Sequence, residues 1–302
     1  MFTAIRMAVG RVVLVAGVLV LLFIPYLLWG TGLLTAQSQA RLRATFSTDQ
    51  RLVKSVPAQH LVAPRADVNP EPPQVAPTTA DPPVGSPVGT IVIPKINLSM
   101  MVVEGTDEAQ LAQGPGHYPG TPLPGEAGNA AIAGHRTTYL HPFYSLDALA
   151  PGDPIWITTL QGVFIYRMIL QQVVSPTDVA VVDPTPEPEL TLTTCNPRYS
   201  ASQRLVVHAV LVASALAHPD PVAVAATVTR HSTPVETAPS KDWLAASLWG
   251  VAVAALITGV WVAARRTRRG ARASVIVGGA VAWLVVVFFF FQSVAPLLPA
   301  SF

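Results

Sequence analysis

The sequence is poor in charged residues. Only 12% of its 302 residues are charged, whereas roughly a quarter is usual for a soluble domain. It has no stripe of Lys and Arg interleaved with aromatic residues, so nucleic acid is not an expected ligand. Hydrophobic residues make up 51% of the chain instead. They concentrate in three long uncharged runs, which leaves the middle of the chain to form one domain of ordinary size.

Each uncharged run is long enough to cross a bilayer. We predict transmembrane helices at 12–30, 243–264 and 273–295, because a hydrocarbon core of about 30 Å needs about 20 apolar residues. Arginines precede the first run and fill the loop 265–272, which has no acidic residue. Since cationic loops stay cytoplasmic, residues 1–11 and 265–272 are predicted inside and the tail 296–302 outside. The expected product is a multi-pass protein of the cell membrane with an extracellular middle region.

The first run has a second interpretation, as a cleaved signal peptide. Ser38-Gln39-Ala40 offers small residues for cleavage. However, the apolar stretch exceeds the roughly 7–15 residues of such a segment, which favours a retained anchor. Both interpretations export the middle of the chain.

The exported region divides by composition. Residues 31–63, with Leu42, Phe46 and Leu52 loosely spaced, are predicted to form a helical stalk. Proline-rich residues 64–88 indicate an extended linker, and residues 218–242 a second one. Between them, 89–217 holds short strand-like runs separated by turn residues, with short helices expected at 106–112 and 144–149. This texture predicts an all-β fold, a small closed barrel or a sandwich.

The chain has a single cysteine, Cys195, and it lies in the exported region. It cannot form an internal disulfide, so it is an intermolecular bridge, an inert buried residue or a nucleophile. It ends a predicted strand and is followed by Asn196-Pro197, which halts strand pairing. Arg204 opens the next strand nine positions later, after a loop short enough for a hairpin that returns it close to Cys195.

These segments resemble the signature of bacterial sortases. The resemblance rests on Thr191-Leu192-Thr193-Thr194-Cys195 with Arg204 downstream, and on Ala133-Gly134-His135-Arg136 upstream, between Pro115-Gly116-His117-Tyr118-Pro119-Gly120 and Pro142-Phe143-Tyr144-Ser145-Leu146. It covers about 89–214 and is strongest to the class E sortases of high-GC Gram-positive bacteria. It implies a sortase-like closed β-barrel with short helices, alongside the three transmembrane helices.

The resemblance also implies an activity. Such an enzyme cleaves a C-terminal sorting signal, LPxTG- or LAxTG-like, of secreted proteins through a cysteine thioester. It then transfers the acyl group to an amine of a cell-wall peptidoglycan precursor or of a pilin. No cofactor or metal is required. Attachment to the cell wall is preferred over pilus polymerisation, because Asp81-Pro82-Pro83 lacks the aromatic residue of a lid.

The chemistry assigns roles to five residues. Cys195 attacks as thiolate, whose formation from a free thiol with a pKa of about 8.5 is favoured by a neighbouring imidazolium. His135 is the candidate imidazolium and later protonates the leaving amine. Arg204 supplies fixed donors to the oxyanion. Thr194 is expected to shape the oxyanion site, and His117 to support the substrate groove.

Each assignment has a competitor. His208 follows Arg204 by four residues and shares its face of a strand, so period-2 geometry alone leaves it open as the base. His141 is expected in the loop after His135, and Arg198 in solvent. At the level of function, the alternatives are a different Cys-His acyltransferase such as an L,D-transpeptidase, whose motifs are not seen, and a catalytically silent membrane-tethered binding domain.

Overall fold

The computed structural model describes residues 2–53, 73–216, 243–267 and 271–295. They fall into two compact units, one of residues 31–53 and 73–216 and the other of residues 2–30, 243–267 and 271–295. Several predicted segments lie wholly or partly outside the described residues. These are the end of the stalk (54–63), the start of the first linker (64–72), the second linker (218–242), part of the arginine loop (268–270) and the tail (296–302).

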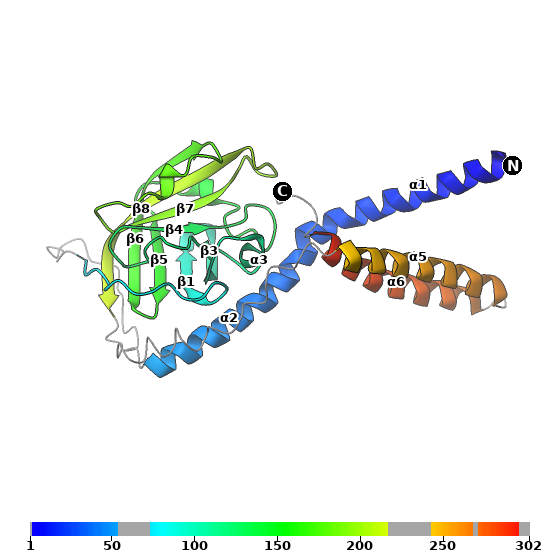
Figure 1. Ribbon diagram of the computed structural model, residues 1–302, viewed down its shortest axis with the longest axis horizontal. Coiled ribbons are helices and arrows are strands. Elements are labelled where there is room, and N and C mark those ends of the chain that lie inside the picture. The colour runs from blue at the N-terminus through cyan, green and yellow to red at the C-terminus, as the bar shows by residue number, and fades with distance from the viewer. Residues whose placement is uncertain (1, 54–72, 217–242, 268–270, 296–302) are drawn as a thin grey trace. The chain divides into compact units, whose positions relative to one another are not determined.

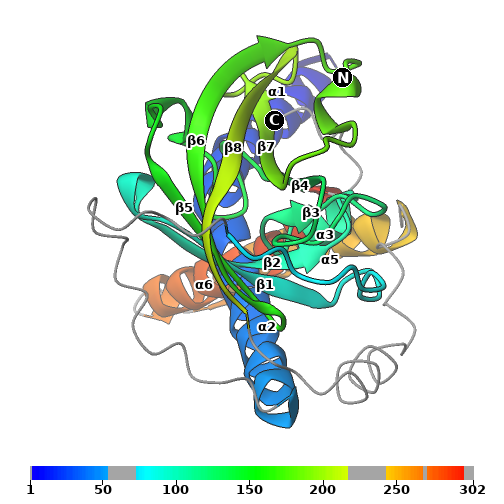
Figure 2. The same ribbon diagram turned by 90° about the vertical axis from the view of Figure 1, so that its left-hand side faces the viewer.

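The exported region forms a closed eight-stranded barrel, as predicted (Figures 1 and 2). Around the barrel the strands run in the order β1-β2-β3-β4-β7-β8-β6-β5. Most neighbours are antiparallel, but β2 and β3 are parallel, and so are β4 and β7. The strands are β1 (Pro87–Ile93), β2 (Leu98–Glu104), β3 (Gly116–His117), β4 (Asn129–Ala133), β5 (Pro154–Thr159), β6 (Gly162–Val174), β7 (Glu189–Asn196) and β8 (Gln203–Leu216).

Alternation of side chains fills the barrel. In β5, Ile155 and Ile157 are fully buried, whereas Trp156 between them is 41% exposed. In β1, Ile91 and Ile93 point into the same core. Successive side chains of a strand lie on opposite faces, so every second residue reaches the interior.

The helices within the barrel domain are short. The helix predicted at 106–112 is α3 (Glu108–Leu111), and the one predicted at 144–149 is the 3₁₀ turn η3 (Leu146–Ala148). Two further 3₁₀ turns are η2 (Pro94–Ile96) and η4 (Ala180–Val182). Glycine or proline follows both predicted helices closely, at Gly114 and Pro151, and limits their length.

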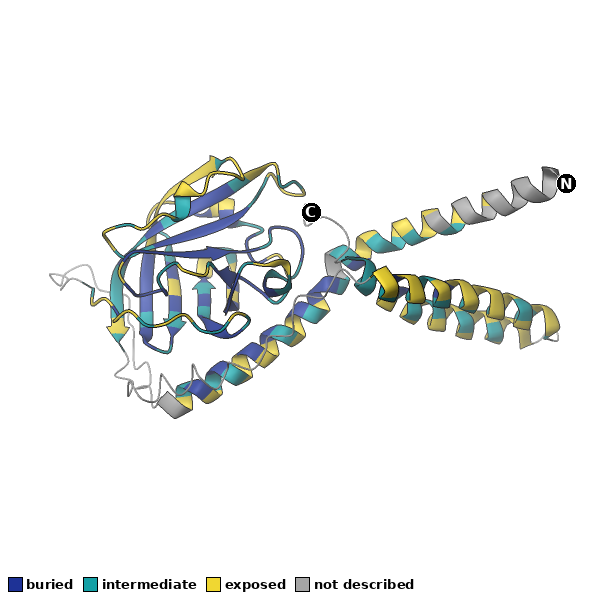
Figure 3. Cartoon of the chain, viewed as in Figure 1, coloured by how far each residue is buried: buried dark blue, intermediate teal, exposed yellow. Residues whose placement is uncertain are grey.

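The predicted stalk helix packs against the barrel. Helix α2 (Thr31–Val53) buries Leu42 and Phe46 against Met101 and Val103 of β2, and Figure 3 shows buried and exposed residues alternating along it. Its Gln39 accepts a hydrogen bond from the Met101 amide (2.7 Å) and donates one to the Met101 carbonyl (3.0 Å). Because β3 pairs only with the last two residues of β2, these backbone groups would otherwise lack a strand partner.

The described part of the first linker is also fastened to the barrel. The Ala76 amide donates to the Gly125 carbonyl (2.8 Å). Glu126 accepts hydrogen bonds from the amide and hydroxyl of Thr79, and Gln161 donates to the Pro77 carbonyl (2.8 Å). Residues 73–86 therefore belong to the barrel domain, where the proline-rich composition had indicated a spacer.

The second unit contains long apolar helices. It consists of α1 (Phe2–Pro25), η1 (Tyr26–Gly30), α5 (Trp243–Arg266) and α6 (Arg272–Val294). Among the described residues, α5 and α6 are the helices found long and apolar enough to cross a membrane. Phe23 packs edge-on against Phe291, and Tyr26 packs against Phe288, so aromatic contacts join α1 and η1 to α6.

Candidate functional site

The β7–β8 hairpin brings Cys195 and Arg204 together. The two strands are antiparallel, and Cys195 lies directly opposite Arg204 in their register. Directly opposed residues have Cβ atoms about 4.5–5.5 Å apart on the same face of the sheet. Both side chains are half-buried, and the Arg204 Nη1 donates to the carbonyls of Ala201 and Gln203, each at 3.1 Å. The return of Arg204 to Cys195, predicted from the nine-residue spacing, is confirmed.

Strand β4 delivers His135 to the same end of the barrel. It runs parallel to β7 in a register that ends with Ala133 opposite Thr193. The Gly134 amide continues this pairing by donating to the Thr193 carbonyl (3.0 Å). His135 is two residues beyond Ala133, and Cys195 is two residues beyond Thr193. The parallel register therefore brings His135 and Cys195 out at the same edge.

The motif glycine before His135 has a packing reason. A Cβ on Gly134 would lie 2.6 Å from the ring of Phe143, which is completely buried beneath this segment. The Phe143 amide donates to the His135 carbonyl (3.1 Å), so the loop between them returns onto the start of the motif. A larger residue at 134 would displace Phe143 or the backbone that carries His135.

His135 is neutral at pH 7. Burial lowers its pKa to about 4, because desolvation disfavours the charged imidazolium. Its Nε2 is buried and has no hydrogen-bond partner among the described residues, and its ring lies 4.9 Å from that of Tyr139. The resting imidazolium expected from the sequence is thus replaced by a neutral imidazole, which is suited to accept a proton.

Thr194 connects the two strands at this edge. Its side chain is buried, and its hydroxyl donates to the carbonyl of Gly134 (2.7 Å). That hydrogen bond fixes the residue before Cys195 to the residue before His135. Thr194 therefore sets the spacing of the two segments through its side chain.

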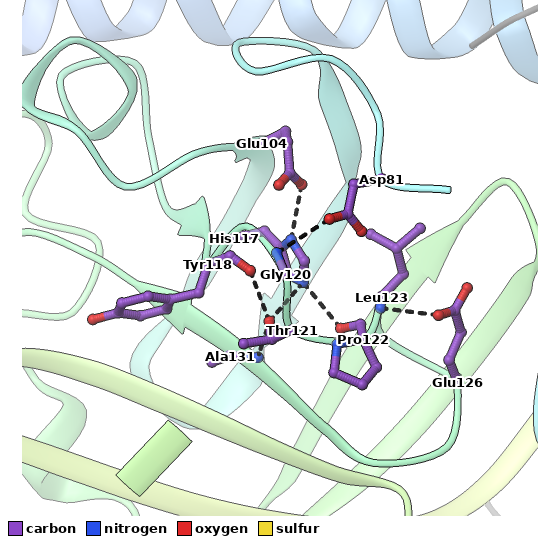
Figure 4. A network of polar contacts seen from close by, with 10 residues as sticks. All are labelled: Asp81, Glu104, His117, Tyr118, Gly120, Thr121, Pro122, Leu123, Glu126 and Ala131. Carbon is purple, nitrogen blue, oxygen red and sulfur yellow. Dashed lines mark hydrogen bonds and ion pairs between the residues drawn. The ribbon is translucent and has the colours of Figure 1, made fainter. Parts of the chain in front are cut away.

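His117 lies inside the domain, away from any groove. Its ring is fully buried, with Nδ1 2.8 Å from Glu104 Oε2 and Nε2 3.0 Å from the Pro122 carbonyl (Figure 4). Burial alone would lower the pKa of His117, but the hydrogen bond and charge of Glu104 raise it overall. Desolvation raises the pKa of Glu104 in turn. The expected support of a substrate groove by His117 does not fit a side chain without solvent exposure.

His208 lies well away from Cys195. It is paired with Thr191, four residues before the cysteine, which corresponds to about 13 Å along a strand. Its ring nitrogens face the Thr191 hydroxyl and the Gln172 amide, each at 3.1 Å. Burial lowers the pKa of His208. Strand register thus separates His208 from the cysteine, a distinction that its shared face with Arg204 could not provide.

Two other competitors have their own surroundings. His141 is exposed, lies in the loop after His135 as expected, and contacts the ring of Tyr144. Arg198 pairs with Asp147 at 2.9 Å and stacks over the Tyr144 ring. Arg198 is therefore held by neighbouring groups on the surface.

The motif arginine after His135 has contacts that sequence reasoning missed. Arg136 is only 4% exposed, and its Nη1 donates to the Cys195 carbonyl (3.2 Å) and to Asn196 Oδ1 (2.6 Å). Its Nη2 lies 3.2 Å from Asp147 Oδ2. Its place beside His135 was the only available signal, because its partners lie 59 and 60 residues away along the chain.

Within the described part of the chain, no cluster of three or more His, Cys, Asp or Glu side chains has the arrangement of a metal site. The groups gathered at the edge of β4, β7 and β8 are a thiol, a neutral imidazole and a guanidinium. Together they offer a nucleophile, a proton acceptor and fixed donors for a developing negative charge.

Comparison with known proteins gives consistent matches. Residues 91–212 match the model of the sortase domain. Sortase SrtE1 of Streptomyces coelicolor is 32% identical over 217 residues, which are 66% of this chain and 55% of that protein. Sortase D of Bacillus subtilis is 36% identical over 117 residues, 38% of this chain and 58% of that protein. YwpE of Bacillus subtilis, a candidate sortase by name, is 33% identical over 88 residues, 29% of this chain and 86% of that protein.

Solved structures give further matches. Sortase E of Streptomyces avermitilis is 37% identical with a TM-score of 0.41, covering 44% of this chain and 92% of that one. Sortase E1 of Streptomyces coelicolor, solved with a tripeptide in its active site, is 32% identical with a TM-score of 0.42, covering 44% and 91%. The chain spans little more than half the length of the first two curated relatives.

Proposed function

Because the chain belongs to the sortase family, we propose that it is a cysteine transpeptidase that cleaves the C-terminal sorting signal of secreted proteins. The signal is of the LPxTG or LAxTG type, and the acyl group passes to an amine of a cell-wall peptidoglycan precursor. One observation carries the proposal. The registers of β4, β7 and β8 bring Cys195, His135 and Arg204 to one edge of the barrel.

The proposed reaction begins with neutral His135. The imidazole takes the thiol proton as Cys195 attacks the carbonyl after the threonine of the signal, and a tetrahedral oxyanion forms. The guanidinium of Arg204, directly across the hairpin from Cys195, stabilises this charge. His135 then donates its proton to the leaving amine, the C–N bond breaks, and a thioester remains. Attack by the acceptor amine reverses these proton transfers and releases the enzyme.

Attachment to the cell wall is favoured over pilin polymerisation. Asp81, the lid-like acidic residue considered above, accepts a hydrogen bond from the Gly120 amide (3.1 Å). Its neighbours Pro77 and Thr79 are bound by Gln161, next to Gly162, which pairs with Leu216 at the far end of β8 from Arg204. This segment is thus tied to the end of the barrel remote from Cys195.

The domain is proposed to be held on the outer face of the cell membrane. Helices α5 and α6 are long and apolar enough to span it, and the arginines between them favour a cytoplasmic loop. We assign the N-terminal helix as a third span, supported by its aromatic contacts with α6. Its retention is supported by α2, because cleavage after Ala40 would separate Gln39 from the part of α2 that contains Leu42 and Phe46.

The activity is tested with the full chain in detergent. Peptides carrying LPxTG, LAxTG or a scrambled signal are incubated with and without triglycine, and the products are weighed by mass spectrometry. We expect cleavage after threonine and an added mass of triglycine on the acyl fragment, both abolished in Cys195→Ala. Cleavage by Cys195→Ala at the wild-type rate, or no cleavage of any signal by the wild type, would overturn the proposal.

A further inference from the structure

We infer that Arg136 is a positioning residue that holds the segment carrying His135 against the backbone of Cys195. The inference rests on the proposed function, in which these two residues exchange a proton. Arg136 follows His135 directly and is only 4% exposed. Its guanidinium donates to the carbonyl of Cys195 itself (3.2 Å) and to the side chain of Asn196 (2.6 Å).

The guanidinium continues the pairing of two strands after their backbone ladder has ended. The last pair of β4 and β7 is Ala133 with Thr193. One residue further, the hydroxyl of Thr194 donates to the carbonyl of Gly134 (2.7 Å). Beyond that point Arg136 supplies the contacts to Cys195 and Asn196. His135 therefore lies between two ties to β7, one on each side of it in the sequence.

Asp147 links Arg136 to a second loop. Its carboxylate lies 3.2 Å from Arg136 and accepts two hydrogen bonds from Arg198, at 2.9 and 3.0 Å. Arg198 belongs to the loop after Cys195, and it also donates to the Tyr144 carbonyl (3.2 Å). The loops that follow His135 and Cys195 are thus connected through one carboxylate.

The contacts require arginine. Arg136 directs two terminal nitrogens at three acceptors on different parts of the chain, the Cys195 carbonyl, the Asn196 amide oxygen and the Asp147 carboxylate. A planar guanidinium offers several donors in a fixed fork, whereas the ammonium of lysine is a point charge on a flexible stem. Lysine at position 136 can therefore keep the charge but lose some of the fixed directions.

The expected effect is on the rate of acylation. Misplacing a catalytic group by about 1 Å can cost about 100-fold in rate. Arg136→Gln is thus expected to slow single-turnover thioester formation about 10- to 100-fold with little change in KM, and Arg136→Lys to recover part of the loss. A residue that served stability alone would lower the thermal midpoint and leave the rate per folded molecule unchanged.

The experiment compares wild type, Arg136→Gln, Arg136→Lys and the control Arg167→Gln in the full chain in detergent. Arg167 is exposed and donates to one backbone carbonyl, that of Gly152 (2.7 Å), away from the site. Two rates are measured per folded molecule, thioester formation with a sorting peptide and alkylation of Cys195 by iodoacetamide at pH 7. Thermal unfolding gives the folded fraction, and Arg136→Lys, which keeps the buried charge, decides the matter if Arg136→Gln does not fold.

Slower acylation and alkylation in the folded Arg136 variants, with Arg167→Gln equal to wild type, support the inference. Wild-type rates in folded Arg136→Lys and Arg136→Gln overturn it, as does an equal loss in Arg167→Gln. If the wild type forms no thioester with any peptide, the proposed function fails. Alkylation needs no peptide and still tests whether Arg136 positions the cysteine and its base.

Discussion

Protonation of His135 should destabilise the barrel in mild acid. Burial lowers its pKa to about 4, while an unfolded histidine has a pKa of about 6.5. The unfolded chain therefore binds more protons between these two values, and stability rises with pH across that window. For His135 alone, linkage gives a loss of about 2 kcal/mol in the free energy of unfolding from pH 7 to pH 5, and about 3.4 kcal/mol in total well below pH 4.

The measurement is the urea midpoint of the full chain in detergent at pH 7 and pH 5, read by brief proteolysis of the unfolded barrel. The variant is His135→Asn, which cannot titrate, and the control is His141→Asn, on the exposed loop six residues later. We expect His135→Asn to lose about 2 kcal/mol less than wild type between the two pH values. The control should show the full wild-type loss.

Equal pH dependence in wild type and His135→Asn would refute this reasoning. It would mean that the imidazole is solvated in the folded protein, against the burial of its Nε2. The same low pKa predicts that the base remains available in mild acid, so kcat/KM should show no loss centred near pH 6.5 that is attributable to His135.

Three further predictions test the surroundings of the site. Glu104→Gln should lower the unfolding free energy by about 3–5 kcal/mol, because it leaves His117 buried without its carboxylate; an unchanged urea midpoint would exclude that ion pair. Gln39→Ala removes three hydrogen bonds, about 1 kcal/mol each, and should speed hydrogen exchange in β2, whereas Thr48→Ala on the same helix should not. His208→Asn should leave thioester formation at the wild-type rate, and a loss equal to that of His135→Asn would reopen the choice of base.

Local features of the sequence predicted one side of the site. The strand ending at Cys195, the proline after the next residue and the nine-residue spacing to Arg204 predict a hairpin, and the observed register confirms it. The barrel was predictable for a similar reason, because short alternating runs such as β5 carry their inward and outward faces in the sequence.

The other side depends on long-range pairing. Strands β4 and β7 are parallel neighbours separated by about 60 residues, and no local spacing announces that they are adjacent. His135 was therefore identified only through the family resemblance. Its neutral state could not be foreseen either, since the pKa depends on burial produced by the whole domain.

The roles of two buried polar residues were hidden for the same reason. His117 stands in a glycine- and proline-rich stretch that looks like an exposed turn, yet Glu104 on β2 draws it into the interior. Gln39 looks like a surface residue of a stalk until its two bonds to Met101 are seen. The spacing of Leu42 and Phe46, four residues apart, was the available sign that this helix has a buried face.

The convergence of thiol and imidazole is tested most directly by a short cross-link. The reagent 1,3-dibromoacetone first alkylates a thiol and then joins it to a nearby imidazole through three carbons. After treatment of the full chain and proteolysis, mass spectrometry should find the peptide of Cys195 joined to that of His135. A cross-link to His208, or a cysteine that carries the reagent with no histidine attached, would contradict the proposed site.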